Sequence, residues 1–107
     1  MIELRRYRRE DGRIPITEWL NGLRDLRARA QIEVRLRRVA AGNFGDCKPV
    51  GDGVSELRID IGAGYRVYFG RHGRALVILL GGGDKSTQQA DIARAKAHWT
   101  DWKRSST

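Results

Sequence analysis

Cysteine and histidine are scarce in this sequence. The single cysteine, Cys47, has no second thiol for a disulfide within the chain, and too few thiols are present for a zinc cluster. The two histidines, His72 and His98, have no third ligand at a metal-binding spacing. We therefore expect the protein to use no metal ion and no other cofactor.

Long apolar stretches are also lacking. No part of the sequence approaches the roughly 20 consecutive apolar residues of a membrane-spanning helix. The first ten residues, MIELRRYRRE, are charged where a secretory signal would carry its apolar segment. These patterns predict a cytoplasmic protein with no membrane partner.

Acidic residues are outnumbered by basic ones. The 107 residues include 21 Lys and Arg against 13 Asp and Glu, which gives a formal net charge of +8. So large an excess of positive charge in a small protein favours a polyanionic partner, most simply a nucleic acid. The alternative is an arginine-rich composition that serves solubility alone. The length fits a single domain, residues 1–107, with one modest core.

Hydrophobic periodicity predicts an α+β fold with a small, largely antiparallel sheet and the order β-α-α-β-β-β-α. The predicted elements are a strand over 2–7, helices over 15–23 and 25–41, strands over 54–61, 65–69 and 75–80, and a helix after Lys85. Asp25 is the expected N-cap of the second helix, whose arginines, Arg35 among them, are expected to point outward. Residues 43–53 hold three glycines and Pro49, so they are predicted to form a loop.

The strands over 54–61 and 65–69 carry the clearest pattern. Apolar residues alternate with charged or polar ones in both, so each strand is expected to have one buried and one open face. The three-residue link Gly62-Ala63-Gly64 suits a hairpin. This link places Arg58 opposite Tyr68 and Asp60 opposite Arg66 on the open face.

Three consecutive glycines, Gly81–Gly83, are predicted to end the last strand. They lead through Asp84 and Lys85 towards a helix, which is typical of phosphate-binding loops, but the spacing of the nucleotide-hydrolase motif is absent. Ser86 and Gln89 match a capping box, so Lys85 is expected to stand directly before the helix N-terminus. The N–H groups at such a terminus favour an anion.

The open face of the hairpin is predicted to form a site that cleaves RNA without a metal. Cleavage needs a base for the 2′-hydroxyl, cations for the charge on the phosphorane and an acid for the 5′ oxygen. The candidate catalytic residues are Arg58, Arg66, Tyr68 and Lys85. The candidate RNA-binding residues are Lys48, Arg71 and Arg74.

A second interpretation of the same face is purely structural. Glu56 and Asp60 alternate with the arginines, so Arg58 and Arg66 have carboxylates with which to form solvated ion pairs. Ion pairs of this kind contribute little to stability and imply no ligand. The sequence alone leaves both interpretations open.

Several motifs, taken in order, resemble one family over nearly the whole chain. They are PITEWL (15–20), GNFGD (42–46) followed by Lys48-Pro49, GVSELRID (53–60), GYRVYF (64–69) and LLGGGDKSTQQADI (79–92). The sequence is similar to the HigB-type, addiction-module killer branch of the RelE/ParE toxin superfamily. The resemblance implies the RelE fold and the activity of a ribosome-dependent mRNA endonuclease that inhibits translation. It also implies neutralisation by a cognate antitoxin with a helix-turn-helix domain.

The resemblance also suggests roles for three residues. Arg66 matches the arginine of the family's Y-R-V motif, which binds the scissile phosphate. Arg58 matches the arginine of the E-L-R motif, and Lys85 stands where relatives carry a basic residue after the last strand. The sequence lacks the paired lysines and the tyrosine of the best-known RelE members, so the acid and the base remain unassigned and Tyr68 is a candidate only.

Two other functions stay open at this stage. The ParE branch of the same superfamily inhibits DNA gyrase and cleaves nothing. A nucleic-acid-binding module without catalysis would also account for the net charge of +8 and would bind RNA or DNA in a salt-sensitive manner.

Overall fold

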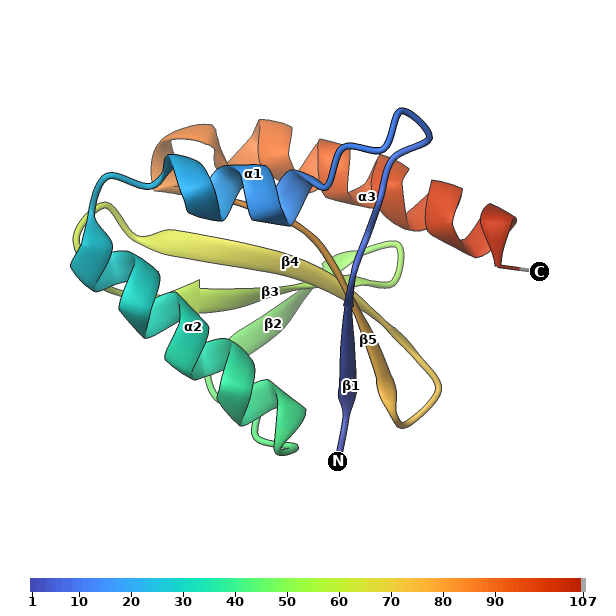
Figure 1. The fold of residues 1–107 in the computed structure, drawn as a ribbon, viewed down its shortest axis with the longest axis horizontal. Coiled ribbons are helices and arrows are strands. Elements are labelled where there is room, and N and C mark those ends of the chain that lie inside the picture. Colours follow the sequence, from blue (N-terminus) through green and yellow to red (C-terminus); the bar gives the residue numbers. More distant parts are fainter. Residues whose placement is uncertain (107) are drawn as a thin grey trace.

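Five strands form one sheet in the order β1-β5-β4-β3-β2 (Figure 1). The computed structural model describes residues 1–106. The elements are β1 (Glu3–Arg6), α1 (Pro15–Gly22), α2 (Leu26–Ala40), β2 (Cys47–Gly51), β3 (Val54–Ile59), β4 (Tyr65–His72), β5 (Leu76–Asp84), the short 3-10 helix η1 (Lys85–Thr87) and α3 (Gln88–Ser105). The predicted α+β class is confirmed. Neighbouring strands are antiparallel except β1 and β5, which are parallel.

The helices lie in two layers, one on each side of the sheet (Figure 1). Apolar residues of α1 and α2, among them Ile16 and Ile32, pack with Leu57, Val67 and Phe69 of the sheet. On the other face, α3 packs through Ala95 and Trp99 against Val54, Tyr68, Ile78 and Leu80. The sheet is therefore covered on both faces, and β1 and β2 are its two edges.

The prediction of a loop over residues 43–53 is wrong in its second half, where β2 forms an additional strand. Pro49 lies within β2, which is an edge strand of the sheet and, within the described residues, pairs with β3 alone. Proline lacks the N–H of a sheet ladder but is tolerated on an edge strand. Asp52, with φ 57°, and Gly53, with φ 83°, then turn the chain into β3. Glycine and proline made this segment look like a loop in the sequence, although both are tolerated in and beside an edge strand.

The predicted hairpin register is wrong by two residues. In the structure Arg58 lies opposite Arg66, and Glu56 lies opposite Tyr68. The connection takes five residues instead of three, because β3 ends at Ile59 and β4 begins at Tyr65. A slip of two residues leaves every side chain on its predicted face, whereas a slip of one would have exchanged the faces.

Gly81–Gly83 do not end the last strand, because β5 runs through them to Asp84. Their lack of side chains serves packing: a Cβ on Gly82 would lie 2.3 Å from the Trp19 ring, and one on Gly83 would lie 1.8 Å from Oδ2 of Asp91. Helices on both faces thus come closer to this stretch than any larger residue would allow. Glycine is rare in strand interiors, so the sequence alone indicates a strand end.

The start of the last helix also differs from the prediction. Asp84, not Ser86, caps this end, since its carboxylate accepts hydrogen bonds from the backbone N–H and the hydroxyl of Ser86. Lys85 lies within η1, and α3 begins at Gln88. The predicted cap of α2 is confirmed, because the Asp25 side chain accepts a hydrogen bond from the N–H of Ala28 at 3.0 Å.

Candidate functional site

Arg66 lies at the centre of the candidate site and is only 5% exposed. Its Nε is 4.0 Å from Oε2 of Glu56, and its Nη1 is 3.8 Å from Oδ1 of Asp60. Nη1 also donates a hydrogen bond to the Tyr65 carbonyl at 3.0 Å, whereas the buried Nε has no hydrogen-bond partner among residues 1–106. The guanidinium is thus held between two carboxylates with part of its hydrogen-bonding capacity unused.

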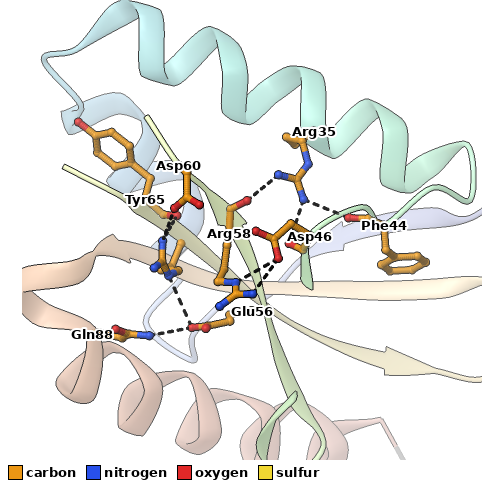
Figure 2. A network of polar contacts seen from close by, with 9 residues as sticks. Arg35, Phe44, Asp46, Glu56, Arg58, Asp60, Tyr65 and Gln88 are labelled. Atoms are coloured by element: carbon orange, nitrogen blue, oxygen red, sulfur yellow. Dashed lines mark hydrogen bonds and ion pairs between the residues drawn. The ribbon is translucent and has the colours of Figure 1, made fainter. Parts of the chain in front are cut away.

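The first turn of α3 covers this pair. Glu56 is 1% exposed, and its Oε2 accepts a hydrogen bond from Nε2 of Gln88 at 3.1 Å. Figure 2 shows Gln88 reaching from α3 to Glu56. The prediction of an open hairpin face is therefore wrong here. Polar groups in the first turns of α3 contact the charged face of the strands. The alternation of charged and apolar residues therefore did not mean that the charged face is exposed to solvent.

Arg58 lies directly opposite Arg66 and keeps 35% of its side chain exposed. Its Nε and Nη2 donate hydrogen bonds to Oδ1 of Asp46 at 3.1 and 3.0 Å. The hydrogen bond with the Asp46 carboxylate raises the pKa of Arg58 above its usual value. The structure therefore brings the two predicted arginines together, although Arg58 does not face Tyr68 as predicted.

Arg35 of α2 holds the chain around Arg58 in place, a role that the sequence analysis missed. Its guanidinium donates hydrogen bonds to the carbonyls of Arg58 at 2.6 Å, and of Phe44 and Asp46 at 3.1 Å each (Figure 2). Arg35 was predicted to point outward, because the helical pattern cannot show that the 43–46 segment folds back onto α2. The signal in the sequence was the GNFGD motif, which carries the Phe44 and Asp46 carbonyls.

The two lysines of the predicted site are exposed and lie on either side of the arginines. Lys48 of β2 lies opposite Glu56, so the two share a face of the sheet. Lys85 of η1 donates its backbone N–H to the Gly64 carbonyl at 3.1 Å, which ties it to the loop before Arg66. Lys48 therefore lies beside Glu56 on the neighbouring strand, and Lys85 lies beside the loop that precedes Arg66.

Tyr68 is fully buried under α3, and its hydroxyl has no hydrogen-bond partner in the part of the chain that the structure describes. Burial raises the pKa of Tyr68 to about 12, and the negative charges of Glu56 and Asp91 add to this effect while Arg66 opposes it. A general acid or base works best with a pKa near the working pH. The burial and the pKa of Tyr68 both make it a poor proton donor to a ligand at the surface.

Tyr68 and Tyr7 offer a matched test of this geometry. Burial raises the pKa of Tyr7 to about 12 as well, but its hydroxyl donates a hydrogen bond to Oδ2 of Asp101. We expect Tyr68→Phe to raise the free energy of unfolding by about 1–2 kcal/mol, because a buried, unsatisfied hydroxyl is removed. Tyr7→Phe is expected to lower it by about 1.5–3 kcal/mol, because a hydrogen bond to a charged group is lost. Urea unfolding at pH 8 measures both, and equal changes would contradict the assignment.

The raised pKa values also fix the direction of the pH dependence. Both tyrosines have a folded-state pKa of about 12, above the usual value of 10.0. Their protonated forms therefore stabilise the fold fully below about pH 10, and this contribution is lost as the pH rises through about 12. The Tyr7→Phe variant should lose less stability than the wild type over this alkaline range.

Arg71 and Arg74 lie away from the other predicted residues. Arg71 is five residues beyond Arg66 on β4, a distance of about 17 Å along a strand. Its guanidinium lies 4.6 Å from the centre of the Phe44 ring, and Arg74 lies in the exposed turn before β5. The structure does not bring these two arginines to the candidate site.

Two further findings concern ions and membranes. Within residues 1–106, no group of three His, Cys, Asp or Glu side chains is placed to hold a metal ion. No helix in the same residues is both long enough and apolar enough to cross a membrane.

The fold and the site define a small, basic α+β protein with two opposed arginines beside a buried glutamate. No family model matches the chain. An uncharacterized protein of Haemophilus influenzae is 59% identical over 78 residues, which cover 73% of this chain and 79% of that protein. The chain therefore belongs to the same family as this Haemophilus influenzae protein.

Proposed function

We propose that this chain is the toxin of a type II toxin–antitoxin system, of the HigB-type branch of the RelE/ParE superfamily. In this proposal it is a metal-independent mRNA endonuclease that acts in the cytoplasm on ribosome-bound mRNA and so inhibits translation. A cognate antitoxin with a helix-turn-helix domain neutralises it. The α+β fold with a mostly antiparallel sheet and the motifs quoted above support this proposal.

The opposed pair of Arg58 and Arg66 is the observation that carries the proposal. Directly opposed residues of antiparallel strands have Cβ atoms about 4.5–5.5 Å apart, so two guanidinium groups share a small area. Two positive charges so close repel each other, and nearby anions offset this repulsion. Here the carboxylates of Asp46, Glu56 and Asp60 form ion pairs with the two arginines. A phosphodiester bound at the same place would supply further negative charge.

The chemistry follows from this arrangement of charge. Arginine forms two parallel hydrogen bonds to phosphate oxygens, so Arg58 and Arg66 suit the charge that builds up on a phosphorane. The remaining requirement is proton transfer to and from the ribose oxygens. Lys85 is exposed and adjoins the same loop, so it is the better candidate for that role than the buried Tyr68.

Cleavage of a translated message by the purified protein tests the proposal. Ribosomes programmed with a defined mRNA are incubated with the chain in a buffer whose Mg²⁺ keeps the ribosomes assembled, and primer extension maps the new 5′ ends. We expect cuts at discrete positions that appear only when the chain is present. Intact message at a protein concentration that arrests growth would contradict the proposal.

One observation favours a second candidate, a ParE-like inhibitor of DNA gyrase without nuclease activity. Arg66 and Tyr68 are buried under α3, and a surface that only docks on a protein needs no accessible acid or base. Supercoiling by purified gyrase separates the two candidates. Inhibition of gyrase with no cleavage of message would support the second, and salt-sensitive RNA binding with neither effect would support a binding module.

A further inference from the structure

Three carboxylates balance the two arginines of the candidate site, and they differ in how they are held. Glu56 is 1% exposed and accepts a hydrogen bond from the first turn of α3. Asp60 lies 3.8 Å from Arg66, which is farther than a hydrogen bond. Asp46 accepts two hydrogen bonds from the side chain of Arg58. Any ligand anion that binds to these arginines therefore competes with carboxylates of the protein itself.

The ion pair of Asp46 and Arg58 is the accessible part of this arrangement. The side chains of Arg58 and Asp46 are 35% and 45% exposed, whereas that of Arg66 is 7% exposed. A ligand that arrives from solvent thus reaches Arg58 before Arg66. The Asp46 carboxylate already accepts hydrogen bonds from Nε and Nη2 of Arg58 (Figure 2). An anion that binds to this edge of the guanidinium must therefore replace Asp46.

The hydrogen-bond geometry favours a phosphate in this exchange. Both N–H groups of Arg58 donate to the same oxygen, Oδ1 of Asp46, at 3.1 and 3.0 Å. A phosphodiester has two non-bridging oxygens, so it can accept one hydrogen bond from each N–H group, as in the paired bonds typical of arginine with phosphate. Exposed ion pairs contribute little to stability. Displacement of Asp46 is therefore an easy step for a phosphate.

The backbone of Asp46 is fixed, so only its side chain has to move. The Asp46 carbonyl accepts hydrogen bonds from the backbone N–H of Arg58 at 2.9 Å and from Nη2 of Arg35 at 3.1 Å. The carboxylate, in contrast, is nearly half exposed and is held by the Arg58 side chain. Rotation of the side chain takes the carboxylate away from Arg58 and leaves both backbone hydrogen bonds in place.

We propose that the Asp46 carboxylate occupies the position on Arg58 that a phosphodiester group of RNA takes when RNA binds, and that Asp46 thereby sets the affinity of the site for RNA. The inference rests on the proposed function, since that function places the phosphate at Arg58. Its consequence is specific: loss of the Asp46 charge strengthens RNA binding, and it does so through Arg58.

Binding of an RNA that cannot be cleaved tests the proposal on the full chain. The probe is a fluorescein-labelled uridine oligomer with 2′-O-methyl groups, which has no free 2′-hydroxyl to act as the nucleophile. Fluorescence anisotropy gives the Kd. We expect Asp46→Asn to lower the Kd about fivefold, a factor that matches the upper end of the strengths measured for exposed ion pairs.

Asp52→Asn is the matched control, because it removes the same charge from the turn between β2 and β3. Asparagine also tolerates the φ of 57° found at Asp52. Four residues of β3 separate Val54, at the end of this turn, from Arg58, a distance of about 13 Å. We expect this variant to change the Kd less than twofold. In an Arg58→Gln background, Asp46→Asn is expected to give no tightening, and circular dichroism verifies that each variant folds.

Several outcomes would overturn the proposal. They are an unchanged or raised Kd in Asp46→Asn, equal tightening in Asp52→Asn, and the same tightening without Arg58. Tightening for a DNA oligomer of matching length but not for the RNA would overturn it too, as would a lack of RNA binding by every variant. The nuclease proposal is judged separately: intact message on ribosomes, together with binding of the oligomer that depends on Asp46, would refute the nuclease and retain this inference.

Discussion

Arg66→Ala is expected to abolish RNA cleavage and growth arrest. In the proposed mechanism the guanidinium stabilises the charge that develops on the phosphorane, and loss of one such donor typically lowers the rate about 10²–10³-fold. Arg66→Lys keeps the charge but not the planar fork, so it should recover only part of the activity. Single-turnover cleavage on programmed ribosomes and colony formation after induction measure the two effects.

The burial of Glu56 requires a second variant in this experiment. Removal of Arg66 leaves a carboxylate that is 1% exposed beside an empty space, which destabilises the protein as well. The neutral double variant Glu56→Gln/Arg66→Met removes both charges and keeps similar volumes. We expect it to fold and to be inactive, while Arg71→Ala, about 17 Å away along β4, stays active. Full toxicity of a folded Arg66 variant at wild-type abundance would refute the assignment.

Trp99→Ala is expected to lower the free energy of unfolding by about 3–5 kcal/mol, the cost typical of removing a large buried aromatic side chain. Trp99 is buried between α3 and the sheet, where it lies against Gly70 and Gly53. A Cβ on Gly70 would come within 2.5 Å of the indole ring, so no other residue fits beneath it. A small domain has a free energy of unfolding of only about 5–15 kcal/mol, so this substitution would remove a large part of it.

Trp102→Ala is the matched control for this effect. Trp102 stacks on Trp99 with ring centres 5.2 Å apart, but it is only partly buried. We expect its removal to cost about half as much or less, because less apolar area leaves water. Urea titration followed by far-ultraviolet circular dichroism gives both midpoints, with similar slopes. Equal losses in the two variants would show that α3 is not held by Trp99.

Periodicity in the sequence predicted the elements of the fold more successfully than their register. The alternation in 54–61 and 65–69 assigned each side chain to the correct face, because strand geometry alone decides it. The pairing of Arg58 with Tyr68 was wrong, because the loop length depends on where β3 stops hydrogen bonding. That end point is set by the tertiary structure, including the hydrogen bond from Arg35 to the Arg58 carbonyl.

The remaining errors have a common physical cause. The sequence predicted that the strand ends at Gly82 and Gly83, but these glycines lie within β5 and permit Trp19 and Asp91 to approach it from opposite faces. The hairpin face with Arg66 read as open, yet the polar first turn of α3 covers it. In both cases the deciding contact comes from a helix that is distant in the sequence or whose own pattern looks solvent-exposed. Such contacts have no periodic signature, so a single sequence does not reveal them.

The parallel pairing of β1 with β5 determines how much of the chain must be synthesised before the sheet can fold. Glu3 lies beside Leu76, so the sheet closes only after more than two thirds of the chain is available. Contacts this far apart in sequence slow folding, since a long loop must be ordered first. The site at Arg66 also requires α3, because Gln88 donates a hydrogen bond to Glu56, the carboxylate that pairs with Arg66. A nascent chain still held in the ribosomal exit tunnel therefore has no finished site, which delays any activity until synthesis is complete.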